Sequence, residues 1–515
     1  MWLIKKFWQN LNIILVLCLI KLFIHLITNT NYSFHRDEYL YLALGKHLSW
    51  GYMEVPPVIA VLAKIIHIFG ANIFITRLFP ALVGCVTVFL LGVMVRDLGG
   101  KKWAQVFACL AFILSPAFLR SNTLFQPVSF NQFCWFLSAF FIVRLIKFQN
   151  VKYWYFLGLV AGMGLLTKYS IAFFYFGFLI AILLTPHRKW FKTKYPYIAA
   201  GIALIIFLPN LIWQYFHHFP IVSHMTELSQ TQLKNVNIAG FLIDQFLSHH
   251  IVSIVWLLGL LFLFFSDRLK MYRVLAWIYL FIILFLIFLS GKSYYSMGAY
   301  TMLFAAGGVA VENFLERKSA YLKYLIIVLM LVATIPVIPY GLPVLRIEKM
   351  KQYCAFMKDN YNIVSPLYWE DGNIYSLPQD FADMHGWEEL AQRVSEFYYS
   401  LPPDERKSCM IYGGGYSHAS SLLYYKKKHN LPEVFSFNGS FIMWAPDSVD
   451  FDRQILVDDV FHTQSSWFEN MDLVDQIQNP NARDPGYIYY RTDPKIDVKQ
   501  QWIDEVKENK SRYNF

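Results

Sequence analysis

The chain has 515 residues, of which 56% are hydrophobic, 18% aromatic and only 16% charged, and its mean hydropathy is +0.38. So much apolar sequence excludes a soluble enzyme of this length and predicts a membrane protein. The net charge of +10 is unevenly divided, because residues 1–342 carry 27 Lys and Arg against 9 Asp and Glu, whereas residues 343–515 carry 18 against 26. We therefore expect two domains in different surroundings.

A sequence pI near 9.0 is also typical of nucleic-acid-binding proteins. Here, however, the positive residues lie in short stretches between apolar runs rather than on one polar face. We expect the lipid bilayer as a partner and no nucleic acid.

Eleven apolar runs are long enough to cross about 30 Å of hydrocarbon, which takes roughly 17–25 residues of helix. They lie near residues 8–28, 73–95, 103–120, 129–148, 153–168, 170–185, 197–215, 249–265, 274–290, 294–312 and 321–340. No small-residue cleavage site follows the first run, so it is interpreted as a retained helix rather than a signal peptide.

Lys and Arg in short loops mark the cytoplasmic side of a membrane protein. They gather at alternate ends of the runs, at Lys5, Lys6, Arg96, Lys101, Lys102, Arg144, Lys147, Lys152, Arg188, Lys189, Lys192, Lys194, Arg268, Lys270, Arg273, Arg317, Lys318 and Lys323. An odd number of spans then places the 29–72 loop, the 216–248 loop and the C-terminal region on the outer side, the periplasm or its equivalent.

The 29–72 loop concentrates acids that the membrane domain otherwise avoids. Asp37, Glu38 and Glu54 fall within eighteen positions, whereas residues 58–342 contain six acids in all. Within this loop, 39–44 and 58–69 are predicted to form helices that lie along the membrane interface.

Two interpretations of Asp37 and Glu38 remain open. An acidic pair can cap an interfacial helix, where the helix dipole favours it. It can also supply a carboxylate base that takes a proton from an acceptor hydroxyl or amine. Glu54 precedes Pro56 and Pro57, and with His224 and the first-loop acids it could hold a divalent metal ion. No cofactor is required by the sequence, and this metal is left open.

Three cations lie at the outer ends of apolar runs, against the charge rule: Arg120, Lys168 and Lys292. Each could extend to the interface simply to reach water. Each would also suit the phosphate of a lipid carrier at headgroup depth, and Tyr294 and Tyr295 beside Lys292 favour a turn that faces a ligand.

Residues 343–515 are predicted to form a folded α/β domain. Strand-like segments at 408–412 and 486–490 alternate with amphipathic helical segments at 387–399 and 417–428. Gly413–Gly415 lacks the spacing of a nucleotide-binding loop and predicts a tight strand-to-helix turn. A disulfide between Cys354 and Cys409 is one open possibility.

Several motifs, taken in order, resemble the GT-C glycosyltransferases that use polyprenyl-phosphate sugars, specifically the bacterial branch of the protein O-mannosyltransferase and aminoarabinose (lipid A) transferase superfamily. They are 35–38 with 51–57, 124–130, 166–169, 209–213, 291–295, 412–413, 431–432 and 444–446. The resemblance implies an all-α polytopic membrane domain of about eleven helices (1–342), with a catalytic outer loop at 29–72, followed by a periplasmic α/β domain (343–515).

The resemblance also implies a bacterial inner-membrane enzyme that moves a sugar, with inversion, from an undecaprenyl-type phosphate to a lipid A, glycan or protein acceptor. Asp37 matches the family's base or orienting group, with Glu38 beside it. Lys168 and Lys292 match basic positions for the donor phosphate, and His224 matches a metal-binding histidine. Val55 stands where the aminoarabinose transferases have a lysine, and Asn131 where related proteins often have an acid, so the acceptor stays open.

Two rival functions have the same apolar bundle. A transporter or flippase of lipid-linked sugars would place ionisable groups near the membrane midplane, whereas the acids here avoid the apolar runs. A structural subunit would leave the clustering of Asp37, Glu38 and Glu54 without a purpose.

Overall fold

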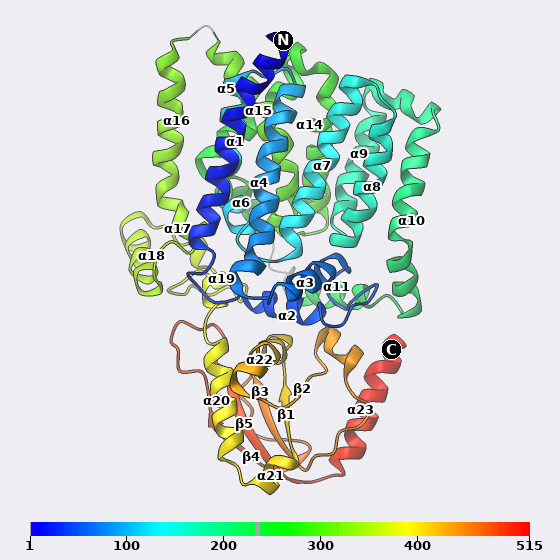
Figure 1. The fold of residues 1–515 in the computed structure, drawn as a ribbon, viewed down its shortest axis with the longest axis vertical. Helices are drawn as coiled ribbons and strands as arrows, with labels where there is room; N and C mark the ends of the chain where they lie inside the picture. Colours follow the sequence, from blue (N-terminus) through cyan, green and yellow to red (C-terminus); the bar gives the residue numbers. More distant parts are fainter. Residues whose placement is uncertain (1, 232–236, 317) are drawn as a thin grey trace. The chain divides into compact units, whose positions relative to one another are not determined.

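The computed structural model describes residues 2–231, 237–316 and 318–515, so Arg317 lies outside the described residues (Figure 1). The chain divides into two compact units. Unit 1 contains Met1–Asn29, Thr76–Leu211 and Thr226–Val344, and unit 2 contains Thr30–Ile75, Ile212–Met225 and Leu345–Phe515. Most of the 29–72 loop, the predicted first outer loop, thus belongs to the same unit as the C-terminal region. The predicted domain boundary at 342/343 remains a prediction.

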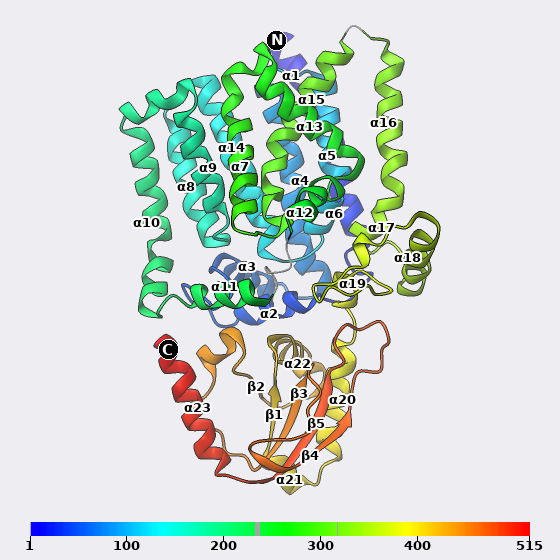
Figure 2. The same cartoon turned by 180° about the vertical axis from the view of Figure 1, so that it is seen from behind.

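Unit 1 is a bundle of helices (Figures 1 and 2). It holds all or most of α1 (Trp2–Thr28), α4 (Ile73–Asp97), α5 (Lys102–Leu114), α6 (Pro116–Ser121), α7 (Pro127–Phe148), α8 (Lys152–Thr167), α9 (Ile171–Leu183), α10 (Tyr195–Phe216), α12 (Ile238–Leu247), α13 (Ser253–Phe265), α14 (Arg273–Phe288), α15 (Tyr300–Leu315), α16 (Ala320–Thr334) and α17 (Ile338–Gly341). Helix α11 (Pro220–Thr231) has residues in both units.

Helices α5, α13 and α15 form the centre of this bundle because small residues let their backbones approach closely. A Cβ atom at Gly307 of α15 would lie 2.0 Å from the carbonyl oxygen of Val255 in α13, and one at Gly259 would lie 2.1 Å from that of Leu303. Such contacts replace the hydrophobic driving force that lipid removes. Glu312 of α15 accepts hydrogen bonds from the backbone N–H groups of Trp103 and Ala104, both at 3.0 Å, and so caps the start of α5.

Each of the eleven predicted runs contains a helix, but the predicted number of spans is not confirmed. Among the described residues, five helices are long and apolar enough to cross a membrane, or up to seven if two bent pairs each count as one span. The run at 103–120 breaks because Ser115 is extended before Pro116, where a proline disfavours helix in the preceding residue. The runs at 153–168 and 170–185 form helices of 16 and 13 residues, which are short for a span.

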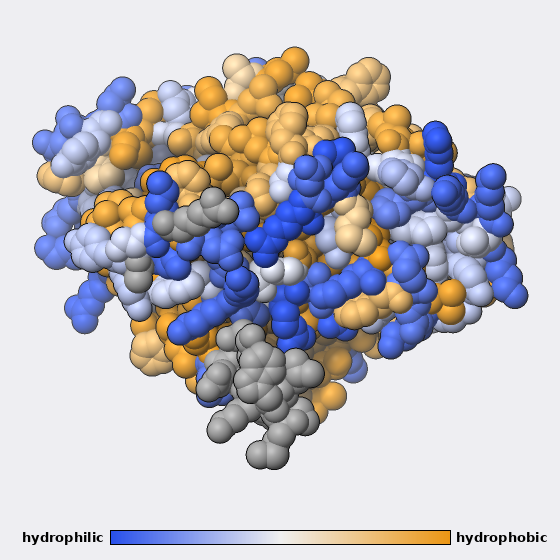
Figure 3. All heavy atoms as spheres, turned by 90° about the horizontal axis from the view of Figure 1, so that it is seen from above, coloured by the Kyte–Doolittle hydropathy of each residue, from blue (hydrophilic) through white to orange (hydrophobic). Residues whose placement is uncertain are grey.

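Several basic residues of the predicted cytoplasmic loops pair with the few acids of unit 1. Asp97 lies 2.9 Å from Arg144 and 3.1 Å from Lys147, and Glu316 lies 2.8 Å from Lys101. Figure 3 looks onto the face where α1 begins, and hydrophilic residues cross it between apolar ones.

Unit 2 contains a five-stranded sheet in the order β2-β1-β3-β5-β4. Its strands are β1 (Cys409–Gly413), β2 (Val434–Phe435), β3 (Arg453–Asp458), β4 (Phe468–Asp475) and β5 (Tyr487–Pro494). Strand β1 pairs in parallel with β2 and β3, and β5 pairs antiparallel with β3 and β4. The helices of the C-terminal region are α18 (Ile347–Tyr361), α19 (Gln379–Ala382), α20 (Trp387–Ser400), α21 (Pro403–Lys407), α22 (Tyr416–His429) and α23 (Val498–Tyr513).

Helices cover both faces of this sheet. Tyr412 of β1 and its neighbour Phe435 of β2 contact Trp502 of α23. Because alternate side chains of a strand point to opposite faces, the row of Ile411, Ile455 and Tyr490 points away from α23. On that face Tyr490 contacts Phe397 of α20, with ring centroids 5.2 Å apart. The predicted α/β arrangement is therefore present, and Gly413–Gly415 forms the expected turn between β1 and α22.

Both predicted interfacial segments of the first outer loop are helices, α2 (Arg36–Leu44) and α3 (Val58–Ile68). Helix α2 packs against α22, and the hydroxyls of Tyr39 and Tyr425 lie 3.1 Å apart between them. No disulfide joins Cys354 and Cys409 in the structure, so the one left open by the sequence does not form.

Candidate functional site

The predicted site residues are divided between the two units. Asp37, Glu38, Glu54 and His224 belong to unit 2, whereas Arg120, Lys168, Lys292, Tyr294 and Tyr295 belong to unit 1.

The start of α2 is a capping box built from local residues. The Nδ1 atom of His35 accepts a hydrogen bond from the Asp37 backbone at 3.2 Å, and the Glu38 carboxylate accepts one from the His35 backbone at 2.9 Å. Glu38 is fully buried. The geometry thus gives Glu38 a capping task at the helix N-terminus, while a catalytic role for it remains untested.

Asp37 is held by a residue from the far end of the chain. The Tyr416 hydroxyl donates a hydrogen bond of 2.8 Å to Oδ1 of Asp37, and Arg36 Nε donates one of 2.9 Å to the same hydroxyl. The Arg36 guanidinium also lies 5.2 Å from the centroid of the Tyr416 ring. The Asp37 side chain keeps 28% of its surface exposed, so the carboxylate is both oriented and reachable from solvent.

Burial and the negative charge of Asp37 raise the pKa of Tyr416 well above its usual value. Tyr416 therefore stays protonated at neutral pH and remains a hydrogen-bond donor to Asp37. A carboxylate oriented in this way can accept a proton from a hydroxyl placed beside it, or orient an acceptor that is already ionised.

A second polar cluster lies behind the capping box. The Nε2 atom of His35 lies 3.6 Å from Asp383 and 3.7 Å from Asp380, and Arg483 lies 3.1 Å from Asp383. Burial lowers the pKa of His35, but Asp37, Asp380 and Asp383 together raise it above its usual value. Burial raises the pKa of Asp383.

His35, Asp380 and Asp383 are also close enough to hold a metal, since their potential ligand atoms lie within 4.8 Å of one another. Two guanidinium groups border the cluster, however: Arg483 and, at 3.9 Å from Asp383, Arg36. Because these cations already neutralise the carboxylates, the arrangement fits an ion-pair network that fixes the start of α2.

Glu54 contacts Ser440 of the C-terminal region and, among the described residues, does not belong to a group of potential metal ligands. Its two oxygens accept hydrogen bonds from the backbone N–H of Ser440 at 2.7 Å and from the Ser440 hydroxyl at 2.5 Å. His224 lies in α11, and no group of three potential ligands among the described residues includes either Glu54 or His224. The metal role of this pair stays a prediction.

In unit 1 the structure brings together three of the predicted phosphate-binding residues. The Lys168 ammonium lies 5.2 Å from the ring centroid of Tyr294 and 5.3 Å from that of Tyr295. All three line a cavity of about 10 Å³, which is room for about one water molecule. Asn131 borders the same cavity and donates a hydrogen bond of 2.9 Å to Ser170, as an amide can and an acid would not.

The other two predicted cations lie outside the lining of this cavity. Lys292 immediately precedes the short 3-10 helix Ser293–Ala299 and is half-buried, and Arg120 lies in the last turn of α6. Their assignment to the donor phosphate stays a prediction.

Tyr416, Asp383 and Arg483 were not identified from the sequence. Tyr416 directly follows the glycine turn, which was recognised as a turn but carried no sign of a partner in the first loop. Tyr416 contacts Asp37 and Asp383 contacts His35 across more than 340 positions, so no local pattern indicates these contacts.

Comparisons with known proteins find a family and a related protein that this chain resembles. Residues 54–213 match the family described as dolichyl-phosphate-mannose-protein mannosyltransferase. The lipid A galacturonosyltransferase RgtD of Rhizobium johnstonii is 26% identical over 208 residues, which are 40% of this chain and 44% of that protein. The match thus spans less than half the length of this relative.

Two crystal structures of ArnT from Cupriavidus metallidurans have a similar fold. The structure with bound undecaprenyl phosphate has a TM-score of 0.59 at 15% identity, and the apo structure 0.56 at 14%; each match covers 93% of this chain and 97% of ArnT. These likenesses show an ArnT-like fold for this chain, and residues 54–213 are similar to the protein mannosyltransferase family.

Proposed function

We propose that this protein is an integral-membrane glycosyltransferase that moves a sugar from a polyprenyl-phosphate donor to an envelope acceptor with inversion. The observation that carries the proposal is the carboxylate of Asp37, which Tyr416 and Arg36 hold in place while part of it stays exposed. The names of the relatives add a donor and an acceptor: ArnT binds undecaprenyl phosphate, and RgtD acts on lipid A. We propose the same classes of substrate here.

In the proposed reaction, the acceptor oxygen attacks the anomeric carbon and the bond from that carbon to the donor phosphate breaks. The phosphate leaves with the bonding electron pair. With a hydroxyl acceptor, Asp37 takes the released proton, an effect typically worth about 10²–10⁴-fold in rate. With a phosphate acceptor there is no such proton, and Asp37 orients the nucleophile instead.

Lys168, with Tyr294 and Tyr295 beside it, is proposed to bind the donor phosphate, together with Lys292 and Arg120. Positive charge there would stabilise the developing negative charge of the leaving group. Glu38 supports Asp37 by fixing the start of α2. Whether Glu54 and His224 hold a divalent metal is a question for chelation.

We place the protein in the bacterial inner membrane, with residues 1–342 as the transmembrane glycosyltransferase domain and 343–515 as a periplasmic domain. The basic loops of the membrane domain and the acidic composition of residues 343–515 support this orientation. The catalytic loop 29–72 would then face the periplasm.

The test is transfer from a labelled polyprenyl-phosphate sugar by the purified full-length protein in detergent, with an envelope extract as the source of acceptors. Wild type should transfer label and Asp37→Asn should not. Asp404→Asn, whose side chain is 95% exposed, is the matched control and should behave as wild type. Normal transfer by Asp37→Asn would remove Asp37 from catalysis. Donor that is bound and flipped in vesicles but never consumed would support the transporter instead.

A further inference from the structure

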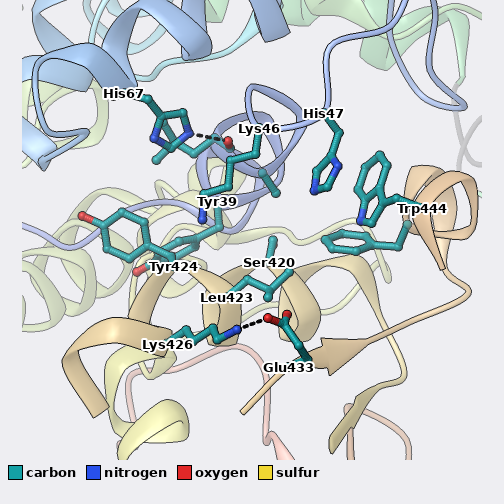
Figure 4. A pocket seen from close by; sticks show the side chains of 13 residues that line it. Tyr39, Lys46, His47, His67, Ser420, Leu423, Tyr424, Lys426, Glu433 and Trp444 are labelled. Carbon is teal, nitrogen blue, oxygen red and sulfur yellow. Dashed lines mark hydrogen bonds and ion pairs between the residues drawn. The ribbon is translucent and has the colours of Figure 1, made fainter. Parts of the chain in front are cut away.

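Unit 2 contains a cavity of about 240 Å³ that the candidate active site does not use (Figure 4). Its walls come from α2 between Tyr39 and Ala43 and the residues that follow it, from His67 at the end of α3, from α22 with Glu433 beyond it, and from the 3-10 helix Gly439–Trp444. Ligand pockets for drug-sized molecules typically measure about 300–1,000 Å³. A ligand here would therefore be smaller, of the size of one sugar unit.

The cavity carries positive charge. Lys46 and Lys426 both line it, and Lys426 pairs with Glu433 (Figure 4). Among the described residues the Lys46 ammonium makes no hydrogen bond and no ion pair. Loss of solvent and the nearby charge of Lys426 lower the pKa of Lys46 more than Glu433 raises it, so the folded protein holds these two cations together at a net cost. An anion bound between them would relieve that repulsion.

One wall of the cavity is flat and aromatic. The rings of Trp444 and His47 are stacked, with centroids 4.4 Å apart and an angle of 3° between their planes (Figure 4). Phe441 packs edge-on against Trp444 at 5.2 Å. Burial and Lys46 lower the pKa of His47, so this ring is neutral at neutral pH. Such a wall suits a ligand with an apolar face, while the lysines and Glu433 can bind hydroxyl groups at its edge.

A simple ion would leave the aromatic wall unused, and an acyl chain would leave the charge of Lys46 unmatched. A pyranose ring with an acidic substituent uses both, because its C–H face is apolar, its rim carries hydroxyls and its charge meets the ammonium groups. Lys46 lies nine residues after Asp37, or about 13 Å along a helix that rises 1.5 Å per residue. Tyr39, two residues after Asp37, lines the cavity, but Asp37 itself is not among the lining residues.

We propose that this cavity is a binding site for an anionic hexose unit, one that carries a phosphate or a carboxylate. The proposal does not rest on the transfer reaction, since it concerns binding at a different place in unit 2. The negatively charged sugar could be free or part of a larger envelope glycan.

The test is calorimetric titration of the purified full-length protein with four probes: glucose 1-phosphate, glucuronate, glucose and inorganic phosphate. At least one of the two anionic sugars should bind, and at least tenfold more tightly than glucose and inorganic phosphate do. The tighter of the two anionic sugars identifies the acidic group. If neither anionic sugar binds, or if inorganic phosphate binds as tightly as they do, the proposal is wrong.

Variants then locate the binding. Lys46→Gln should weaken the anionic sugar at least tenfold, whereas Lys427→Gln, on the same helix as Lys426 but outside the lining, should leave it unchanged. Trp444→Leu should weaken the sugar and leave the weak binding of inorganic phosphate as it was. Each variant is first checked for a wild-type melting temperature, and Lys46→Met, which also removes the charge, replaces Lys46→Gln if that variant does not fold. Equal binding by wild type and the Lys46 variant would exclude this cavity as the site.

Discussion

The hydroxyl of Tyr416 donates a hydrogen bond of 2.8 Å to Oδ1 of Asp37, a residue 379 positions earlier in the chain. Through this bond the first outer loop and the glycine turn of the C-terminal region form one polar arrangement within unit 2. Arg36 Nε donates a hydrogen bond of 2.9 Å to the same hydroxyl. The following predictions test this arrangement, the proposed phosphate site and two contacts that stabilise unit 2.

Replacing Tyr416 by Phe removes the hydrogen bond to Asp37 and keeps the ring. A hydrogen bond to a charged group contributes about 1.5–3 kcal/mol, so we expect kcat of sugar transfer to fall at least tenfold while the affinity for the donor stays within about twofold. Steady-state kinetics with a labelled donor would measure both. Tyr368→Phe, at an exposed tyrosine, should keep wild-type rates. An unchanged kcat for Tyr416→Phe would mean that Asp37 needs no orientation from Tyr416.

Replacing Lys168 by Gln should weaken binding of a polyprenyl phosphate about tenfold, which corresponds to about 1.4 kcal/mol. The reason is that its ammonium, which lies beside the Tyr294 and Tyr295 rings, is proposed to contact the phosphate. Titration of the lipid in detergent, followed by native mass spectrometry, would measure the affinity. Lys189→Gln, an exposed lysine on a predicted cytoplasmic loop, is the control and should bind as wild type. Equal affinities for all three proteins would remove Lys168 from the phosphate site.

The buried ion pair between His418 and Asp484, 3.0 Å apart, predicts a pH-dependent stability. Burial lowers the pKa of His418, but the charge of Asp484 raises it above its usual value. The pair therefore stabilises the folded state fully below about pH 6.5, and this contribution is lost as the pH rises through the folded-state pKa. For Asp484, burial raises the pKa, but His418 and its hydrogen bonds lower it, so its contribution is lost only as the pH falls below about 3.8.

Melting temperatures of wild type should accordingly fall between pH 6.5 and pH 8.5. His418→Gln should melt at a lower temperature at pH 6 and show a shallower decline above it. His462→Gln changes a histidine that pairs with Asp458 nearer the surface, and it should keep the wild-type slope. A slope that is equally steep in His418→Gln would assign the pH dependence to other groups.

Ser440→Ala should destabilise unit 2, because it removes the hydroxyl that donates to Glu54 at 2.5 Å and accepts from the Met53 backbone at 2.9 Å. With Glu54 charged and this contact partly buried, we expect a loss of about 1–3 kcal/mol in the free energy of unfolding. Chemical denaturation in detergent would measure it, with Ser448→Ala at an exposed serine as the control. Chelation separates this contact from a metal role: a metal held by Glu54 would make wild type sensitive to EDTA and Glu54→Gln insensitive.

How much could be predicted from the sequence depends on how far apart in the chain the interacting residues are. Apolar runs indicated the helices of unit 1. Strand-like segments indicated β1 and β5, and amphipathic segments indicated α20 and α22. The order of the motifs indicated the family. The number of spans could not be counted in the same way, because a run of apolar residues can contain a break. At Ser115 and Pro116 the composition stays apolar while the helix ends.

The sequence by itself determined the membrane class, the helices and the local capping of α2, since these depend on hydropathy and on neighbours three or four positions apart. His35 and Glu38 belong to this group. Only the tertiary structure decided which residues meet Asp37 and Glu54, and that no disulfide joins Cys354 and Cys409. The physical reason is that Tyr416 and Ser440 reach the first loop through the packing of α2 against α22 and of the first loop against the C-terminal region. Contacts across more than 370 positions depend on that packing and leave no trace in local sequence.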